Sequence, residues 1–123
     1  HADYAGNVAL IDEQIRQIST AIERRGEWDE TLVVIVSDHD EMDGDAELVY
    51  KSNFFDGALW MPLWVKRRGA VDGAVCTAPV EWIDIGPIRV EVFGGETDYP
   101  QFGRLLHPLL NNPKDEHRVA AIS

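Results

Sequence analysis

The sequence has little cysteine, little basic charge and no long apolar run, and each shortage excludes a class of protein. Cys76 is the only cysteine, which excludes an intrachain disulfide framework. Acidic residues outnumber basic ones 22 to 11, and the net charge of −11 repels the phosphate backbones of nucleic acids. No stretch reaches the roughly 18 apolar residues that a membrane span requires, and no signal peptide is recognisable. We therefore expect no nucleic-acid partner and no membrane partner, and the cysteine content does not choose between cytoplasm and periplasm.

What the sequence does contain is the composition of a globular domain, with helical and extended patterns in alternation. Hydrophobic residues make up 45% and charged residues 27% of 123 residues, which is enough for one domain with a modest core. An apolar stripe with spacings of three and four predicts an amphipathic helix over about 5–25, ended by Gly26. The stripe consists of Val8, Ile11, Ile15, Ile18 and Ile22. The unbroken apolar run 31–36 predicts a strand covered on both faces, as in a parallel sheet flanked by helices.

The second half of the chain carries weaker signals. Residues 58–66 predict a second strand, and residues 101–110 a short helix. Residues 80–94 fit two structures, because part of the segment alternates like a strand while the whole fits a helix that stops at Gly94. Residues 118–122 predict a last, truncated strand. The order of these elements predicts an α/β fold, with part of a sheet flanked by helices.

A cluster of acids and one histidine follows the first predicted strand, in the sequence SDHDEM at 37–42. A solvated turn is one interpretation, and a metal site is the other. An EF-hand is excluded by counting, because a loop that begins at Asp38 has Asp43 where glycine is required, and one that begins at His39 lacks the first carboxylate. Asp38 and His39 together remain a usable half-set of ligands for zinc, manganese or calcium. They follow a buried strand at its carboxyl end, where α/β sheets bind their ligands, and the other ligands must come from elsewhere.

Residues 37–51, SDHDEMDGDAELVYK, resemble a segment that reads SDHGEMLGDHGLWGK in many sulfatases. The flanks agree in order and spacing. Residues 4–38 are similar to the helix and strand that precede this segment in the family, residues 79–95 to a VDLAPTLLDLAG-like stretch, and residues 102–123 to DGRSLLPLL and the strand beyond it. The chain thus resembles the C-terminal part of the sulfatase catalytic domain, within the alkaline-phosphatase superfamily.

The resemblance implies roles for individual residues. Asp38 and His39 match the family's second pair of metal ligands, which implies a divalent metal ion, calcium first, with manganese or zinc as alternatives. Lys51 matches the catalytic lysine that contacts the sulfate or phosphate group of the substrate, a task suited to a compact positive charge. Two positions depart from the pattern. Asp40 replaces a glycine and either adds charge to the site or points to solvent, and Ala46 replaces a histidine.

The family's nucleophile motif, C/S-x-P-S/T-R with its cysteine converted to formylglycine, is missing from residues 1–123. Cys76, in CTAPV, lacks the arginine and follows the Asp-His pair instead of preceding it, so we interpret it as inert. We expect residues 1–123 to form one domain, a fragment of a sulfatase-like catalytic domain without the N-terminal nucleophile segment, and to be inactive alone. His117 is expected to be exposed.

Three functions remain open at this stage. The first is a metal-dependent sulfatase-like hydrolase whose partner is a small-molecule sulfate ester. The second is a phosphodiesterase or a hydrolase of phosphonate or phosphate esters from the same superfamily. The third is a non-enzymatic acidic module that forms a homo-oligomer, because a truncated sheet exposes an edge and apolar surface.

Overall fold

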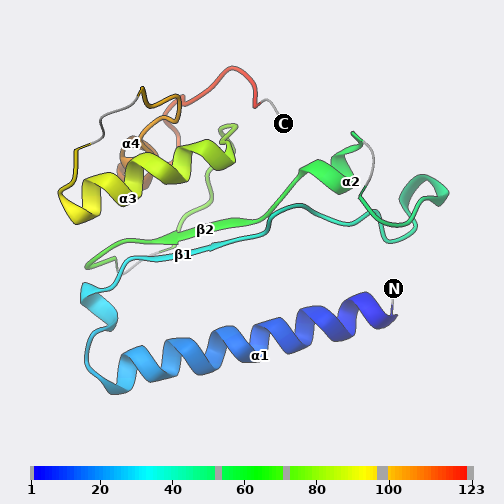
Figure 1. Cartoon of the computed structure of the whole chain (residues 1–123), viewed down its shortest axis with the longest axis horizontal. Helices are drawn as coiled ribbons and strands as arrows, with labels where there is room; N and C mark the ends of the chain where they lie inside the picture. The colour runs from blue at the N-terminus through cyan, green and yellow to red at the C-terminus, as the bar shows by residue number, and fades with distance from the viewer. Residues whose placement is uncertain (1, 52–53, 71–72, 97–99, 122–123) are drawn as a thin grey trace. The chain divides into compact units, whose positions relative to one another are not determined.

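The computed structural model describes residues 2–51, 54–70, 73–96 and 100–121. Its elements, in chain order, are α1 (Ala2–Arg24), the 3₁₀ turn η1 (Trp28–Glu30), β1 (Val33–Val36), η2 (Asp45–Glu47), α2 (Asp56–Leu59), β2 (Leu63–Lys66), η3 (Trp82–Asp84), α3 (Ile85–Phe93) and α4 (His107–Asn111) (Figure 1). The contacts divide the chain into two compact units, residues 1–70 and 71–123. Within the part of the chain described, no helix is long and apolar enough to cross a membrane.

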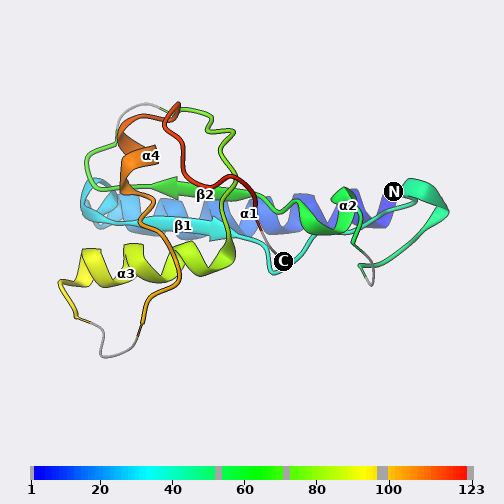
Figure 2. The same cartoon turned by 90° about the horizontal axis from the view of Figure 1, so that it is seen from above.

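Helix α1 confirms the prediction of a helix over 5–25. Gly26 takes a left-handed φ of 70°, which lets the Glu27 amide turn back and donate to the Ile22 carbonyl at 3.2 Å. The helix runs along one face of the β1–β2 pair, as both views of this unit show (Figure 2). None of its side chains is buried, and Val8 is 50% exposed. The apolar stripe of α1 therefore lies largely at the surface of the first unit.

The strands β1 and β2 form a two-stranded antiparallel sheet, in which Val33 lies opposite Lys66 and Val36 opposite Leu63. The expectation of a parallel sheet is wrong for these strands, because the chain returns along β1 after an excursion over residues 37–62 and makes no crossover. All four residues of β1 are half-buried, so neither face of the strand is fully covered within the described residues.

Strand β2 is shorter than the predicted 58–66. Ala58 belongs to α2 and is buried there, and β2 begins only after Pro62, which has no amide hydrogen to give to a sheet. At its other end, Lys66 donates to the Thr31 carbonyl at 3.1 Å, and its amine lies 4.7 Å from the centre of the Trp28 ring. This lysine therefore ties the end of β2 to η1.

In the second unit, residues 80–94 resolve as η3 followed by α3, so the helical alternative is correct. Pro87 lies in the first turn of α3, where a missing amide hydrogen leaves no helical bond unmade. Gly94 ends the helix at a φ of 63°. The core of this unit consists of Asp84, Pro87, Ile88, Leu106 and Leu109.

The C-terminal expectations hold only in part. The helix predicted over 101–110 is the shorter α4, with Pro108 in its first turn. The strand predicted over 118–122 is wrong for 118–121, which form no regular element, and residue 122 lies outside the described residues. Gly103 passes so close to η3 that a Cβ atom there would lie 2.1 Å from the Ile83 carbonyl oxygen, which explains why this position needs glycine.

Candidate active site

Strand β1 is followed by a short turn, which is stabilised by hydrogen bonds between its own side chains and backbone. The Ser37 hydroxyl donates to the His39 carbonyl at 2.6 Å, and the His39 amide donates to Asp38 Oδ1 at 3.0 Å. Short polar side chains bond readily to neighbouring backbone groups in this way and favour turns over the continuation of a strand. The turn brings the second carboxylate oxygen of Asp38 to the imidazole of the next residue.

The ring of His39 is oriented by a backbone carbonyl. Nδ1 lies 3.1 Å from the carbonyl oxygen of Asp40. Because a carbonyl can only accept, Nδ1 carries the proton in this contact, and in the neutral ring Nε2 then bears the lone pair. Lys51 Nζ donates to this Nε2, and Asp38 Oδ2 lies 3.3 Å from it.

Asp38 Oδ2 and His39 Nε2 have the separation expected of two ligands on one cation. Donors at 2.0–2.6 Å from a single ion lie roughly 3 Å apart. With Nδ1 protonated, both atoms offer lone pairs, so they repel one another unless a positive charge faces them, and the ammonium of Lys51 is the cation bonded to Nε2 here. The donor set fits half of a metal site. Among the described residues, no group of three or more His, Cys, Asp or Glu side chains completes it.

Exposure leaves this half-site open. The side chain of Asp38 is 78% exposed and that of His39 is 37% exposed. A structural metal site is closed on all sides, whereas a catalytic one keeps positions for substrate and water. Within residues 1–123 both side chains are therefore accessible to ligands and to a substrate group that this chain does not itself supply.

A tight loop brings Lys51 back to His39, although the two are twelve positions apart in the sequence. The Met42 amide donates to the Tyr50 carbonyl at 3.2 Å, and the Gly44 amide to the Leu48 carbonyl at 2.8 Å. Five residues of the loop have positive φ angles: Asp43, Gly44, Ala46, Glu47 and Tyr50. Met42 is buried at the base of the loop. Its sulfur packs close to Gly57, so that a Cβ atom added at Gly57 would lie 3.2 Å from the sulfur.

The sequence prediction thus named three residues, Asp38, His39 and Lys51, that the structure brings together. It left open where the extra carboxylate of Asp40 points. Asp40 Oδ1 accepts a hydrogen bond from the Glu41 amide at 2.9 Å and another from the Tyr4 hydroxyl at 3.3 Å.

Tyr4 was missed by the sequence prediction. It stands four residues before Val8, on the same face of α1 as the apolar stripe, and this spacing was the available signal. Partial burial raises the pKa of the Tyr4 hydroxyl, and the nearby Asp40 carboxylate raises it further. The hydroxyl therefore keeps its proton and remains a donor to Asp40.

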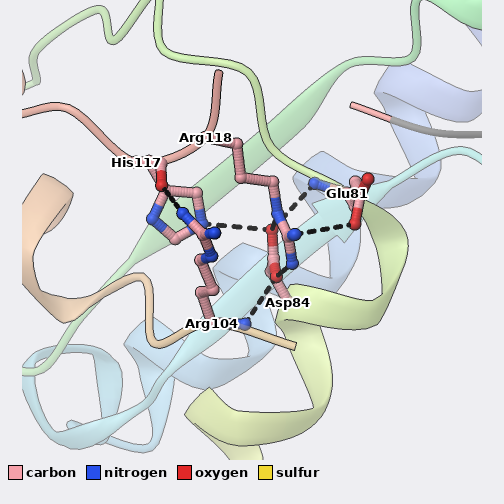
Figure 3. Close-up of polar contacts among 5 residues, drawn as sticks. All are labelled: Glu81, Asp84, Arg104, His117 and Arg118. Carbon is pink, nitrogen blue, oxygen red and sulfur yellow. Dashed lines mark hydrogen bonds and ion pairs between the residues drawn. The ribbon is translucent and has the colours of Figure 1, made fainter. Parts of the chain in front are cut away.

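The second unit holds a separate polar cluster, in which four residues surround the fully buried Asp84 (Figure 3). Asp84 accepts from the amides of Glu81 at 2.9 Å and Arg104 at 2.6 Å, from His117 Nε2 at 3.1 Å, and from Arg118 through Nε at 3.0 Å and through Nη2. Arg118 Nη1 also pairs with Glu81 Oε2 at 3.1 Å, and the Arg104 guanidinium donates to the His117 carbonyl.

The cluster corrects one prediction and explains one pKa. His117 was expected to be exposed, yet its side chain is only 4% exposed and bonds to Asp84. Burial raises the pKa of Asp84, but the hydrogen bonds from Arg118, Arg104, Glu81 and His117 outweigh that cost and hold the pKa well below its usual range. With its lone pairs committed to these donors, Asp84 holds the second unit together and has no capacity left for a ligand.

Comparison with known proteins decides the family. A profile of the family described as Sulfatase matches residues 1–74. The chain belongs to the sulfatase family. The multifunctional alkaline phosphatase superfamily protein PehA of Trinickia caryophylli is 33% identical over 92% of the chain, and the choline-sulfatase of Rhizobium meliloti (strain 1021) is 31% identical over 74%. This sulfatase-family chain spans about a fifth of each relative, 22% and 18% of their lengths.

Solved structures agree with this assignment. The phosphonate monoester hydrolase SpPMH from Silicibacter pomeroyi is 32% identical, with a TM-score of 0.78 over 89% of this chain and 21% of that one. The structure of BT4656 in complex with its substrate D-glucosamine-2-N,6-O-disulfate is 25% identical, with a TM-score of 0.82 over 93% of this chain and 23% of that one. The sulfatase-type α/β fold predicted from the sequence is therefore confirmed.

Proposed function

We propose that this chain is part of a metal-dependent hydrolase of sulfate esters, and that it contributes one side of the metal site and a cation for the substrate. The observation that carries the proposal is the convergence of Asp38 Oδ2, His39 Nε2 and Lys51 Nζ at the end of β1. Membership of the sulfatase family and the likeness to choline-sulfatase support a sulfate ester as the substrate.

Each residue has a distinct task in this proposal. Asp38 and His39 hold one face of a divalent cation through a carboxylate oxygen and an imidazole nitrogen, with calcium as the first candidate and manganese or zinc as alternatives. A bound cation would supply Lewis-acid stabilisation of charge on the ester oxygens. The Nε2 lone pair can serve one partner only, so a Lys51 ammonium that binds the anionic ester group leaves Nε2 to the cation. Lys51 then stabilises the negative charge that develops on the transferred group.

The 123 residues alone are proposed to be catalytically inactive, because they contain no match to the nucleophile motif of the family. A phosphonate or phosphate ester is the second candidate substrate, favoured by the likeness to a phosphonate monoester hydrolase and to a relative described as multifunctional. Sulfate and phosphonate monoesters both present anionic oxygens to a cation and a lysine, so the three residues serve either substrate.

The metal site is tested by calorimetric titration of Ca²⁺, Mn²⁺ and Zn²⁺ into the metal-free, full-length protein. The double variant Asp38→Ala/His39→Ala is expected to bind at least about 100-fold more weakly, since even the outer partners of metal ligands are worth about 10–100-fold in affinity. Asp12→Ala/His107→Ala removes an exposed carboxylate and an imidazole elsewhere and serves as the matched control. Equal affinity in the two double variants would contradict the proposed ligands.

The substrate class is tested on the same protein with an aryl sulfate, an aryl phosphonate monoester and a phosphodiester. A sulfate-ester hydrolase should give its highest kcat/KM with the aryl sulfate, and preference for the phosphonate would favour the second candidate. Turnover of none of the three by the metal-loaded protein contradicts both. Turnover of the aryl sulfate by the isolated 123-residue chain would refute the inactivity proposed for it.

A further inference from the structure

Asp40 follows the candidate metal ligands in the sequence and is bonded to several parts of the first unit. Its amide donates to the Ala58 carbonyl in α2 at 3.1 Å, and its carboxylate Oδ1 accepts from the Glu41 amide at 2.9 Å and the Tyr4 hydroxyl at 3.3 Å. Its own carbonyl oxygen faces His39 Nδ1 at 3.1 Å. One residue thus joins α1, α2 and the imidazole, all within the first unit.

These contacts argue against Asp40 as a third metal ligand. Its Oδ1 is already shared by two hydrogen-bond donors, and no third carboxylate or imidazole joins Asp38 and His39 within the described residues. They also argue against a carboxylate that merely points to solvent, because Asp40 is half-buried and bonded to a helix 36 residues away in sequence. The carboxylate is turned toward α1, and the carbonyl of the same residue is turned toward His39.

We propose that Asp40, tethered to α1 by Tyr4, is a positioning residue for His39. The side-chain bonds fix the peptide of Asp40, and its carbonyl accepts the Nδ1 proton. The Nε2 lone pair is thereby aimed at the position shared by the cation and Lys51. A metal-binding histidine whose second nitrogen is bonded to a backbone carbonyl has its tautomer and ring orientation set in advance. This inference rests on the proposed function, since it assigns Nε2 as a metal ligand.

The experiment measures the metal dissociation constant of the full-length protein by competition with a chelator, beside kcat and KM. Asp40→Ala removes the carboxylate and should weaken metal affinity by about 10–100-fold. Asp40→Asn keeps an acceptor oxygen at the same place and should recover most of that loss. Tyr4→Phe removes only the hydroxyl and should weaken affinity by about threefold to tenfold. Asp12→Ala is the control for the loss of an exposed acid from α1.

The variants separate positioning from a charge effect and from a purely structural role. If Asp40→Asn bound the metal as weakly as Asp40→Ala, the negative charge of Asp40 would matter and its hydrogen bonds would not. That result would overturn the positioning role. Unchanged affinity in Tyr4→Phe would overturn the tether to α1, even if Asp40→Ala failed to fold. A purely structural role would lower the melting temperature while leaving the dissociation constant of the folded protein unchanged, which also overturns the proposal.

Failure of the proposed function would look different. In that case the double variant Asp38→Ala/His39→Ala would bind metal as tightly as the unchanged protein. That result would overturn both the ligand assignment and the positioning role. Loss of metal binding in the double variant together with wild-type affinity in Asp40→Ala would leave the ligands in place and overturn Asp40 alone.

Discussion

Replacing Asp84 by asparagine is the sharpest test of what holds the second unit together. The substitution preserves the shape of the side chain and removes its charge. The carboxylate accepts all five of its hydrogen bonds, whereas the amide nitrogen of asparagine can only donate. The amide nitrogen must therefore face at least one N–H group, which is left without an acceptor. Arg118, whose side chain is 12% exposed, also loses its main counter-charge.

The magnitude follows from these contacts. Removing one partner of a buried ion pair costs about 3–5 kcal/mol, because the other charge is left without compensation. Arg118 keeps Glu81 at 3.1 Å, and asparagine keeps one acceptor oxygen, so the lower end of that range applies. A loss of about 3 kcal/mol corresponds to roughly 100-fold more frequent local opening of this unit.

Hydrogen exchange followed by mass spectrometry measures this opening in the full-length protein. Peptides from α3 and from residues 104–118 should exchange about 100-fold faster in Asp84→Asn, while peptides from α1 stay unchanged. Glu116→Gln, which neutralises an exposed acid beside His117, is the matched control and should leave exchange unaffected. Exchange within twofold of the unchanged protein in Asp84→Asn would refute the assignment of Asp84 as the centre of the cluster.

The pH dependence has a defined sign. The pKa of Asp84 is lower in the folded chain than in the unfolded one, so its contribution is fully present above the ordinary carboxylate pKa, about 3.9. It is lost as the pH falls from there toward the lower folded pKa. After correction for intrinsic exchange rates, the difference between Asp84→Asn and the unchanged protein should therefore persist at neutral pH and shrink below about pH 4.

Two further substitutions test other parts of the molecule. Lys51→Ala should lower kcat/KM for the preferred ester by about 100–1,000-fold without weakening metal affinity, because it removes the substrate's cation and no metal ligand. The exposed Lys114→Ala should leave kcat/KM unchanged, and equal effects of the two variants would remove Lys51 from the site. Gly103→Ala should destabilise the protein by about 1–3 kcal/mol in denaturant unfolding, because the new Cβ would lie 2.1 Å from the Ile83 carbonyl oxygen. Gly73→Ala is the control, because no atom lies within 4 Å of its Cβ position, and it should leave the stability unchanged. Equal stability of the two variants would contradict the close approach at Gly103.

Local patterns predicted much of the first unit. The stripe with spacings of three and four marks α1 correctly, because helical periodicity is a property of adjacent turns. The apolar run before Ser37 forms a strand, and Asp38 and His39 follow its end as predicted. An apolar run and the polar residues that end it are both local signals. The register with the sulfatase family then added Lys51, which no local pattern would have connected to His39.

The sequence did not predict features that depend on distant partners. The antiparallel pairing of β1 with β2 is set by how residues 37–62 fold back, and no periodicity records that path. The burial of His117 depends on Asp84, which lies 33 positions earlier in the sequence. In the sequence alone, a histidine between charged residues has the pattern of an exposed side chain. The bond between Tyr4 and Asp40 was missed for the same reason, because the two meet across 36 residues.

The geometry of the loop between Met42 and Tyr50 requires a fixed number of residues and, at its left-handed positions, residue types that tolerate a positive φ. Its closure relies on main-chain bonds and on left-handed residues, and its side chains at 45–49 are exposed. An insertion or deletion of one residue would carry Lys51 away from His39, whereas changes of side chain at the exposed Leu48 and Val49, which have no positive φ, leave the return path intact. Leu48 and Val49 are therefore natural positions for related chains to diverge in the surface beside Asp38 and His39, and suitable positions at which to randomise side chains while keeping the lysine in place.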